Sequence, residues 1–158
     1  HILGFHPSYE AYNNPIVWKQ EKDTLEKTLN IEVEFGREHY LRFEAPFTWQ
    51  IWEDSNMLWD STLNYADHEG FRCGTCWEYH VFNFLTKQEL QLVEKPLIVM
   101  EGNFFTYQKE LKIDTVRNKI VYLINKCKKY NGTFVYLWHN TSLLTNDRKE
   151  LYIKTLLL

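Results

Sequence analysis

A helix pattern that runs directly into a strand pattern limits the folds open to this chain more than any other part of the sequence. Asp114 can cap the helix, and Asn131 with Gly132 supplies its stop signal. The run TFVYLWHN, residues 133–140, then predicts a fully buried strand that ends on two polar side chains. The apolar positions of the helix recur at helical spacing: Val116, Ile120, Leu123, Ile124 and Cys127.

The same alternation of strand and helix patterns recurs along the rest of the chain. Strand-like segments are residues 2–5 and the runs IEVEF, HYLRF, MLWD, LQLVEK and PLIVME. Helices are expected at about 15–30, 46–56 and 146–157, the first with Asn14 as its cap and Pro15 in its first turn. The expected apolar faces carry Trp18, Leu25 and Leu29 in the first helix and Phe47, Ile51 and Trp52 in the second. This alternation predicts an α/β fold built on parallel strands.

Length and composition suit one domain over residues 1–158, because 44% hydrophobic residues are enough for a core. The net charge of -3 comes from 18 basic and 21 acidic residues mixed along the chain, which gives no basic stripe for nucleic acid. No run reaches the roughly 18 apolar residues that span a membrane. The chain begins HILGFH, as if within a strand, so we expect a piece of a longer protein.

Three cysteines, Cys73, Cys76 and Cys127, are an odd number and argue against a disulfide framework. They slightly favour the cytoplasm, while export stays open if an upstream signal exists. The C-x-x-C pair of Cys73 and Cys76 admits a zinc or a redox reading, with His68 and His80 as nearby further ligands. The simpler interpretation is that both are small buried loop residues.

Polar side chains follow four of the predicted strands: His6, Asp60, Glu101 and His139. The carboxyl ends of parallel strands form the ligand face of α/β folds, so we expect these groups to meet there. Two imidazoles and two carboxylates on one face suit metal-assisted hydrolysis. The polar segment 61–79 is too long for a simple connection and predicts a functional loop beside them.

Four ordered motifs carry a resemblance to a known family: GFHPSY, HYLRFEAPFTW, WDSTLNYADHEGFRCGTC and LWHN. Together they resemble polysaccharide deacetylases of carbohydrate esterase family four, the NodB-homology group, and in particular variants associated with bacterial capsule and O-antigen biosynthesis. The resemblance implies an irregular, incomplete TIM-like (β/α) barrel. It also implies a divalent metal, often zinc, and hydrolysis of the N-acetyl group of an amino sugar.

The metal ligands implied by the resemblance are only partly matched. His6 matches the first histidine of the family's second motif, but the position four residues later is Glu10, so the second ligand is either Glu10 or His39. Arg42 resembles the arginine of the third motif by position. The family's aspartate pair has no match here, which would make this chain the C-terminal portion of a catalytic domain, without its N-terminal strands.

The terminal LWHN resembles the family's late Leu-x-His motif, which implies that Leu137 lines the acetyl pocket and His139 is the general acid. An imidazole suits that role because the amine must be protonated as it leaves. Further candidates orient catalytic groups or hold sugar hydroxyls, with ion pairing as the alternative reading: Arg42, Asp60, Asp67 and Arg72. Aromatic candidates for stacking on a sugar, with core packing as the alternative, are Tyr65, Trp77 and Trp138.

The sequence therefore predicts a metal-dependent carbohydrate N-deacetylase that acts on a polysaccharide or its precursor. The alternative is a catalytically inactive, deacetylase-like domain that binds carbohydrate or serves as a scaffold, because the second histidine and the aspartate pair are unmatched.

Overall fold

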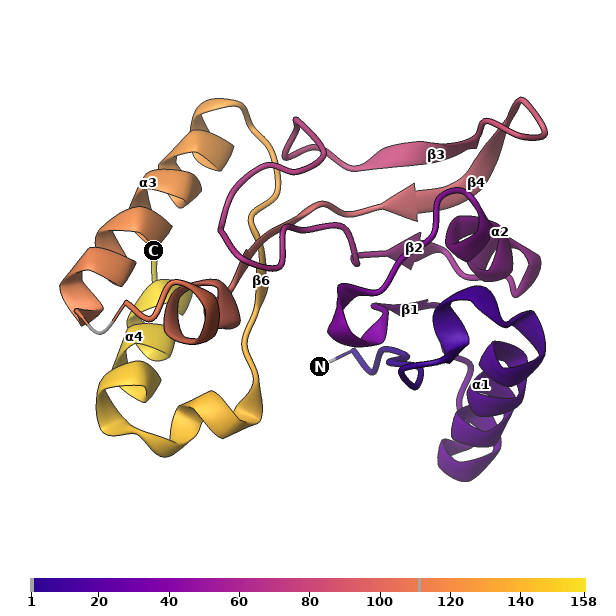
Figure 1. Ribbon diagram of the computed structural model, residues 1–158, viewed down its shortest axis with the longest axis horizontal. Coiled ribbons are helices and arrows are strands. Elements are labelled where there is room, and N and C mark those ends of the chain that lie inside the picture. The colour runs from indigo at the N-terminus through magenta and orange to yellow at the C-terminus, as the bar shows by residue number, and fades with distance from the viewer. Residues whose placement is uncertain (1, 111) are drawn as a thin grey trace. The chain divides into compact units, whose positions relative to one another are not determined.

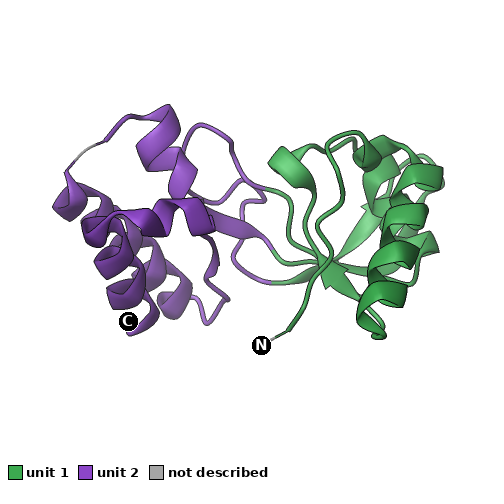
Figure 2. Ribbon diagram, turned by 90° about the horizontal axis from the view of Figure 1, so that it is seen from below, with its two compact units in different colours: residues 1–63, 78–95 green, residues 64–77, 96–158 purple. Residues whose placement is uncertain are grey.

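The computed structural model describes residues 2–110 and 112–158 and has the predicted mixture of helices and mainly parallel strands (Figure 1). The chain divides into two compact units, each built from two separate stretches (Figure 2). Unit 1 comprises residues 1–63 and 78–95, and unit 2 comprises residues 64–77 and 96–158. Each unit has its own hydrophobic core and is described by itself.

Unit 1 is built on a four-stranded sheet in the order β1-β2-β4-β3. The strands are β1 (Phe35–Gly36), β2 (Trp59–Asp60), β3 (Tyr79–Asn83) and β4 (Gln88–Glu94). β1, β2 and β4 are parallel, and β3 is antiparallel to β4. Phe5 adds a parallel bridge beside Gly36, so β1 has a neighbour on both sides.

Two helices and two short turns complete unit 1: η1 (Ala11–Asn13), α1 (Pro15–Leu29), η2 (His39–Leu41) and α2 (Phe47–Asp54). The Asn14 side chain accepts a hydrogen bond from the Val17 backbone, as predicted for a helix cap. Asn30 ends α1 in the left-handed conformation. The core of unit 1 is centred on Trp18 and Trp52, whose rings meet edge to face.

Unit 2 contains the parallel pair β5 (Leu97–Met100) and β6 (Val135–Leu137). The helical elements are η3 (Asn103–Tyr107), α3 (Ile113–Lys129), η4 (Asn140–Leu144) and α4 (Asn146–Leu156), and α3 packs against α4. The predicted α3 stripe, Val116, Ile120, Leu123, Ile124 and Cys127, is buried throughout. It packs with Ile98 and Val99 of β5 in the core of unit 2.

Several predictions of local structure are wrong. HYLRF is not a strand, because its first three residues form η2, with Tyr40 at φ 57° and Leu41 at φ 54°. Both sides of β1 are already paired, which leaves no edge there for another strand. Asp114 lies in the first turn of α3 rather than at the cap position, which Lys112 occupies. The strand from the TFVYLWHN run is shorter than expected and only half-buried.

Two residues assigned to buried helix faces are also exposed: Leu29 at the end of α1 and Phe47 at the start of α2. Both lie in terminal turns, beyond the part of each helix that covers the core. The α/β class is confirmed, whereas a barrel stays a prediction, as does the single-domain assignment. Among the described residues, no helix is both long and apolar enough to cross a membrane.

Candidate functional site

A histidine–carboxylate pair lies at the carboxyl ends of the two strands of unit 2. Met100 and Leu137 are register partners in the parallel pair β5–β6. Glu101 directly follows Met100, and His139 lies two residues after Leu137, so both side chains stand at the same edge of the pair. The Nδ1 atom of His139 lies 2.7 Å from Oε1 of Glu101, and the Ser142 hydroxyl donates to the same oxygen at 2.9 Å. Glu101 is 3% exposed.

This geometry fixes the chemistry that His139 can offer. A carboxylate accepts the proton on Nδ1, which leaves Nε2 as the nitrogen that exchanges protons with a ligand. The side chain of His139 is 51% exposed, so a ligand can reach it. Oε2 of Glu101 is buried and has no hydrogen-bond partner within the described chain. The arrangement suits general acid–base catalysis.

A pair of histidines in unit 1 corresponds to the two predicted metal ligands. Nδ1 of His6 lies 2.7 Å from the carbonyl oxygen of Arg37, which can only accept, so this nitrogen carries a proton. Nε2 of His6 then accepts from Nδ1 of His39 at 2.9 Å. The two rings meet edge to face with centroids 4.9 Å apart. The structure therefore brings His6 and His39 together, as proposed from the sequence.

Two imidazoles are fewer ligands than the three protein groups of a catalytic zinc site. Within residues 2–110 and 112–158, no group of three or more His, Cys, Asp or Glu side chains is arranged to hold a metal. The pair fits part of a metal site and lacks the third protein ligand among the described residues. Because His6 belongs to unit 1 and His139 to unit 2, their predicted meeting in one pocket stays a prediction.

Glu10, the alternative second ligand, is paired with Arg42 at 3.3 Å. Arg42 also donates to the Tyr9 carbonyl oxygen at 2.7 Å, and its guanidinium lies over the rings of Tyr9 and Tyr12, 3.9 and 4.1 Å from their centroids. Arg42 thus holds the turn that follows His6. The contacts fit a positioning role for this arginine, and its catalytic role stays a prediction.

Asp60 lies in a buried carboxylate pair of unit 1. It is the register partner of Glu94 across the parallel strands β2 and β4, and both are fully buried. Burial raises the pKa of Asp60 to about 6, although hydrogen bonds such as the one from Thr62 at 2.5 Å act to lower this pKa. Burial and the neighbouring Asp60 charge raise the pKa of Glu94 well above its ordinary value. The pair therefore tends to retain a proton.

Arg37 lies close to these carboxylates. Its guanidinium donates to the carbonyl oxygen and the hydroxyl of Ser61 at 2.6 and 3.0 Å. Burial lowers the pKa of Arg37, and the Asp60 and Glu94 charges oppose that change. Asp60 is thus an interior group, and its predicted catalytic role remains untested. The sequence analysis did not single out Glu94, although it ends a strand pattern with a carboxylate, as Asp60 does.

The three candidates from the loop that follows Ser61 all lie in unit 2. Tyr65 stacks on His68 with ring centroids 3.9 Å apart, and Asp67 lies 2.7 Å from Nδ1 of His68. Arg72 donates to the carbonyl oxygen of Asn64 at 2.9 Å. No helix or strand forms between Ser61 and Glu78, so the loop prediction is confirmed. Whether these groups contact a sugar stays a prediction.

The remaining two candidates flank the end of β6. Leu137 is half-buried in the strand. Trp138 packs among Phe105, Tyr136 and Tyr152, with ring centroids 5.3 to 6.2 Å away. Its indole Nε1 is buried without a hydrogen-bond partner among the described residues. This packing agrees with the core reading of Trp138 and leaves its sugar-binding role untested.

Cys76 meets Cys127 of α3 inside the core of unit 2. Burial is the main cause that raises the pKa of Cys127 to about 12, and the neighbouring Cys76 thiol adds to the increase. The Cys127 thiol therefore stays protonated. Cys76 and Cys127 are buried, while Cys73 is half-buried. The zinc reading of the C-x-x-C pair gains no support from the described residues.

The sequence predicts Glu101 at a strand end, as one of two carboxylates on the ligand face, but it gives no signal for Ser142. Glu101 directly follows the buried run Leu97–Met100, which is the signal that marks a residue at the ligand edge of a sheet. Ser142 lies three residues after His139 in η4, where the turn brings it back to the same carboxylate. The contact between the carboxylate and the histidine itself follows from the parallel pairing of β5 with β6, which the strand patterns do not show.

No family model and no curated protein sequence matches the chain. Comparison with solved structures gives the class of fold, an α/β arrangement that also occurs in a structure assigned to polysaccharide deacetylation. That structure is a "putative polysaccharide deacetylase" from Mycobacterium smegmatis, with a TM-score of 0.73 over 99% of this chain and 14% identity. The chain spans 56% of that protein's length. At this identity the similarity shows the fold alone.

Proposed function

We propose that the chain is part of the catalytic domain of a carbohydrate N-deacetylase in which His139 is the general acid. The observation that carries the proposal is the 2.7 Å contact of His139 with the buried Glu101 at the carboxyl ends of β5 and β6. The fold shared with the mycobacterial protein and the late Leu137-x-His139 motif support the same activity. The substrate class would be an N-acetylated amino sugar in a polysaccharide or its precursor.

The chemistry follows from the orientation of the imidazole. When the tetrahedral intermediate of amide hydrolysis collapses, the C–N bond breaks and the departing nitrogen needs a proton. His139 would donate that proton from Nε2, while Glu101 accepts from Nδ1 and stabilises the positive charge on the ring. Ser142, which donates to the same Glu101 oxygen, would hold the carboxylate in place.

A divalent metal, with zinc as the first choice, is part of the proposal. His6 and His39 would supply two of its ligands, because their ring nitrogens already meet at 2.9 Å. Bound there, a metal would polarise the acetyl carbonyl and a water molecule. Metal analysis of the full-length protein, with His6→Ala and His39→Ala as variants, measures this independently of turnover.

The proposal also covers the roles of further candidate residues, the barrel architecture and the subgroup of deacetylases. Leu137 would line the acetyl pocket, while Arg42 and Asp60 would orient catalytic groups. The substrate contacts would be Tyr65, Asp67, Arg72 and Trp138. The TIM-like barrel, completed by strands outside this chain, and the capsule and O-antigen subgroup belong to the same proposal.

Deacetylation of N-acetylated glycans by the full-length protein tests the function. We expect His139→Ala to lower the rate about 10²- to 10⁴-fold, the usual contribution of a general acid. Glu101→Gln should lower the rate less, because the imidazole remains but loses the carboxylate that accepts from Nδ1 and stabilises its positive charge. His80→Ala is the matched control, since His80 is an exposed histidine of β3.

A wild-type rate in His139→Ala would refute the assignment of the acid. A full-length protein that binds no metal and deacetylates none of the N-acetylated glycans would instead favour the inactive carbohydrate-binding alternative. A wild-type rate in Glu101→Gln would show that the Glu101 carboxylate does not assist His139.

A further inference from the structure

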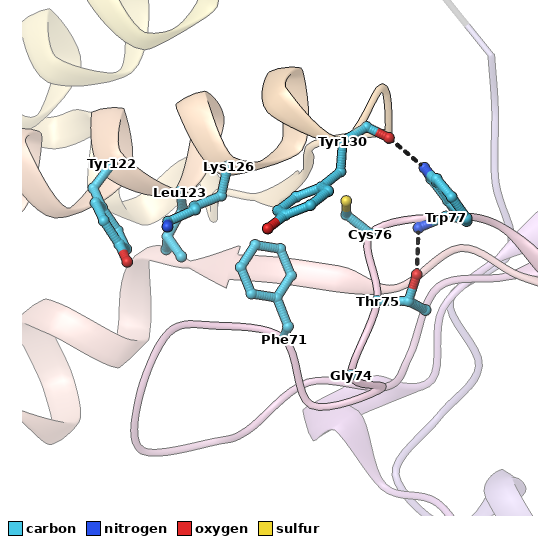
Figure 3. Close-up of a pocket in the computed structure, with 9 residues that line it drawn as sticks. All are labelled: Phe71, Gly74, Thr75, Cys76, Trp77, Tyr122, Leu123, Lys126 and Tyr130. Atoms are coloured by element: carbon cyan, nitrogen blue, oxygen red, sulfur yellow. Dashed lines mark hydrogen bonds between the residues drawn. The ribbon is translucent and has the colours of Figure 1, made fainter.

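Unit 2 contains a cavity of about 520 Å³ between α3 and the loop that carries Phe71 to Trp77 (Figure 3). This volume lies within the range of small-molecule sites. The close-up shows Tyr122 and Lys126 on α3, with the Lys126 side chain directed toward Tyr122, and Phe71 pointing up from the loop on the opposite side. Four of the nine lining residues are aromatic, and the proposed deacetylation uses none of the nine.

Three aromatic rings at this cavity remain open to solvent: Trp77 is 58% exposed, Tyr122 59% and Tyr130 55%. Rings that served only the core would be covered, as Trp18 and Trp52 are. Trp77 is nevertheless held in place, because its indole Nε1 donates to the Tyr130 carbonyl oxygen at 2.8 Å. An ordered, uncovered aromatic wall suits stacking against the flat face of a ligand.

Lys126 gives the cavity its charge, since no other lining residue is ionised at neutral pH. Its ammonium lies 5.1 Å from the centroid of the Tyr122 ring. Lys119, on the same helix, is paired with Glu69, whereas Lys126 forms no ion pair within residues 2–110 and 112–158. A carboxylate on the ligand would therefore find a cation that the protein does not neutralise.

The cavity is separate from the His139 dyad within unit 2. The loop is tied to the start of β6, because the Thr133 backbone N–H donates to the Cys76 carbonyl oxygen at 2.8 Å. His139 follows the other end of that strand. Six residue steps along an extended chain span on the order of 20 Å, so a ligand in the cavity does not occupy the proposed catalytic position.

We infer that this cavity binds an acidic sugar unit of a glycan, with the pyranose face on Trp77, Tyr122 and Tyr130 and the carboxylate on Lys126. The choice of a sugar rather than another flat anionic ring rests on the proposed function. The site would hold a glycan chain at a distance from the bond that is hydrolysed. It would give the protein a preference for polymers that contain uronic acids.

The test compares digalacturonate with neutral galactobiose, two probes that differ in their carboxylates. Binding is measured by titration calorimetry and by the shift of the Trp77 indole N–H signal in nuclear magnetic resonance spectra. We expect digalacturonate to bind more tightly and Lys126→Gln to weaken it about tenfold, as for one charged hydrogen bond. Lys149→Gln, an exposed lysine of α4, is the control for net charge.

Tyr122→Ala should also weaken binding, whereas Tyr107→Ala removes an equally exposed tyrosine away from the cavity and should not. Equal binding of both probes, no binding of either, or no effect of Lys126→Gln would each overturn the inference. A protein that binds digalacturonate at the cavity but deacetylates no glycan would refute the proposed function and would still support the inferred sugar site. A protein that deacetylates glycans but does not bind digalacturonate at the cavity would support the proposed function and refute the inferred sugar site.

Discussion

Glu38 is a buried carboxyl group whose charge should weaken unit 1 as the pH rises. Its Oε1 accepts hydrogen bonds from the indoles of Trp18 at 3.0 Å and Trp52 at 2.7 Å, while Oε2 is buried without a partner among the described residues. Burial, opposed by these two hydrogen bonds, raises the pKa of Glu38 from 4.5 to about 8. The nearby Asp60 charge contributes to this increase in pKa.

The sign of the pH effect follows from proton binding. Between pH 4.5 and about 8 the folded chain holds a proton on Glu38 that the unfolded chain has lost, so the free energy of unfolding falls as the pH rises. The stabilisation is complete below the unfolded pKa and is lost as the pH rises to the folded pKa. From pH 5 to pH 8 the loss is about 3 to 4 kcal/mol, at roughly 1.4 kcal/mol per pKa unit.

Glu38→Gln isolates this effect, because the amide oxygen can still accept from both indoles but the group cannot ionise. We expect the variant to gain about 3 to 4 kcal/mol relative to the wild type between pH 5 and pH 8. Urea unfolding followed by tryptophan fluorescence at both pH values measures the difference. Glu32→Gln, at an exposed position, should leave the pH dependence unchanged. If wild type and Glu38→Gln respond alike to pH, Glu38 is ionised in the fold and the reasoning fails.

Two further predictions concern the local structure of unit 1. Asn14→Ala removes the side chain that caps α1 through Val17 and should lower the free energy of unfolding by about 1 kcal/mol, measured by urea unfolding; an unchanged value would mean that the cap is replaced by water. Gly36→Ala places a Cβ 2.1 Å from the carbonyl oxygen of Phe5 and should cost more than the cap, about 2 kcal/mol or above, with a lower melting temperature by calorimetry. A Gly36→Ala protein as stable as the wild type would show that the Phe5 bridge does not form in solution.

The helices could be predicted because their signals are local. The α3 stripe at helical spacing is buried throughout, and Asn131 at φ 53° with Gly132 ends the helix as expected. The cap of α1 also follows from Asn14 and Pro15 alone. Asp114 shows the limit of such signals, because a carboxylate is favourable both at the cap position and in the first turn.

The strands were harder to predict because partners from elsewhere in the chain decide them. β3 is not predicted by the sequence, because an apolar residue of this strand is exposed and a polar one is buried. Phe82 faces solvent, while Asn83 is buried and donates to the Gln50 side chain at 2.7 Å. HYLRF alternates like a strand, yet hydrogen bonds from Leu41 to Glu38 and from Arg42 to His39 close it into a turn. A short alternating pattern cannot show whether a sheet edge is free to receive it.

The sequence predicts where the candidate site residues lie along the chain. It does not predict which of them contact one another. Asp60, Glu101 and His139 all follow or end strands, as expected, because a strand pattern marks its own end. The contact of His139 with Glu101 depends on the parallel pairing of β5 with β6, and that of His6 with His39 depends on the turn η2. Neither the pairing nor the turn was visible in the sequence.

The division of unit 1 into two stretches affects the order in which it can assemble during synthesis. β4 holds the sheet together between β2 and β3, yet it follows residues 64–77, which belong to the other unit. A nascent chain that has emerged only to Leu63 therefore lacks the strand against which α2 packs. The first helices must wait for β4 to leave the ribosome before their tryptophans have a complete core to enter.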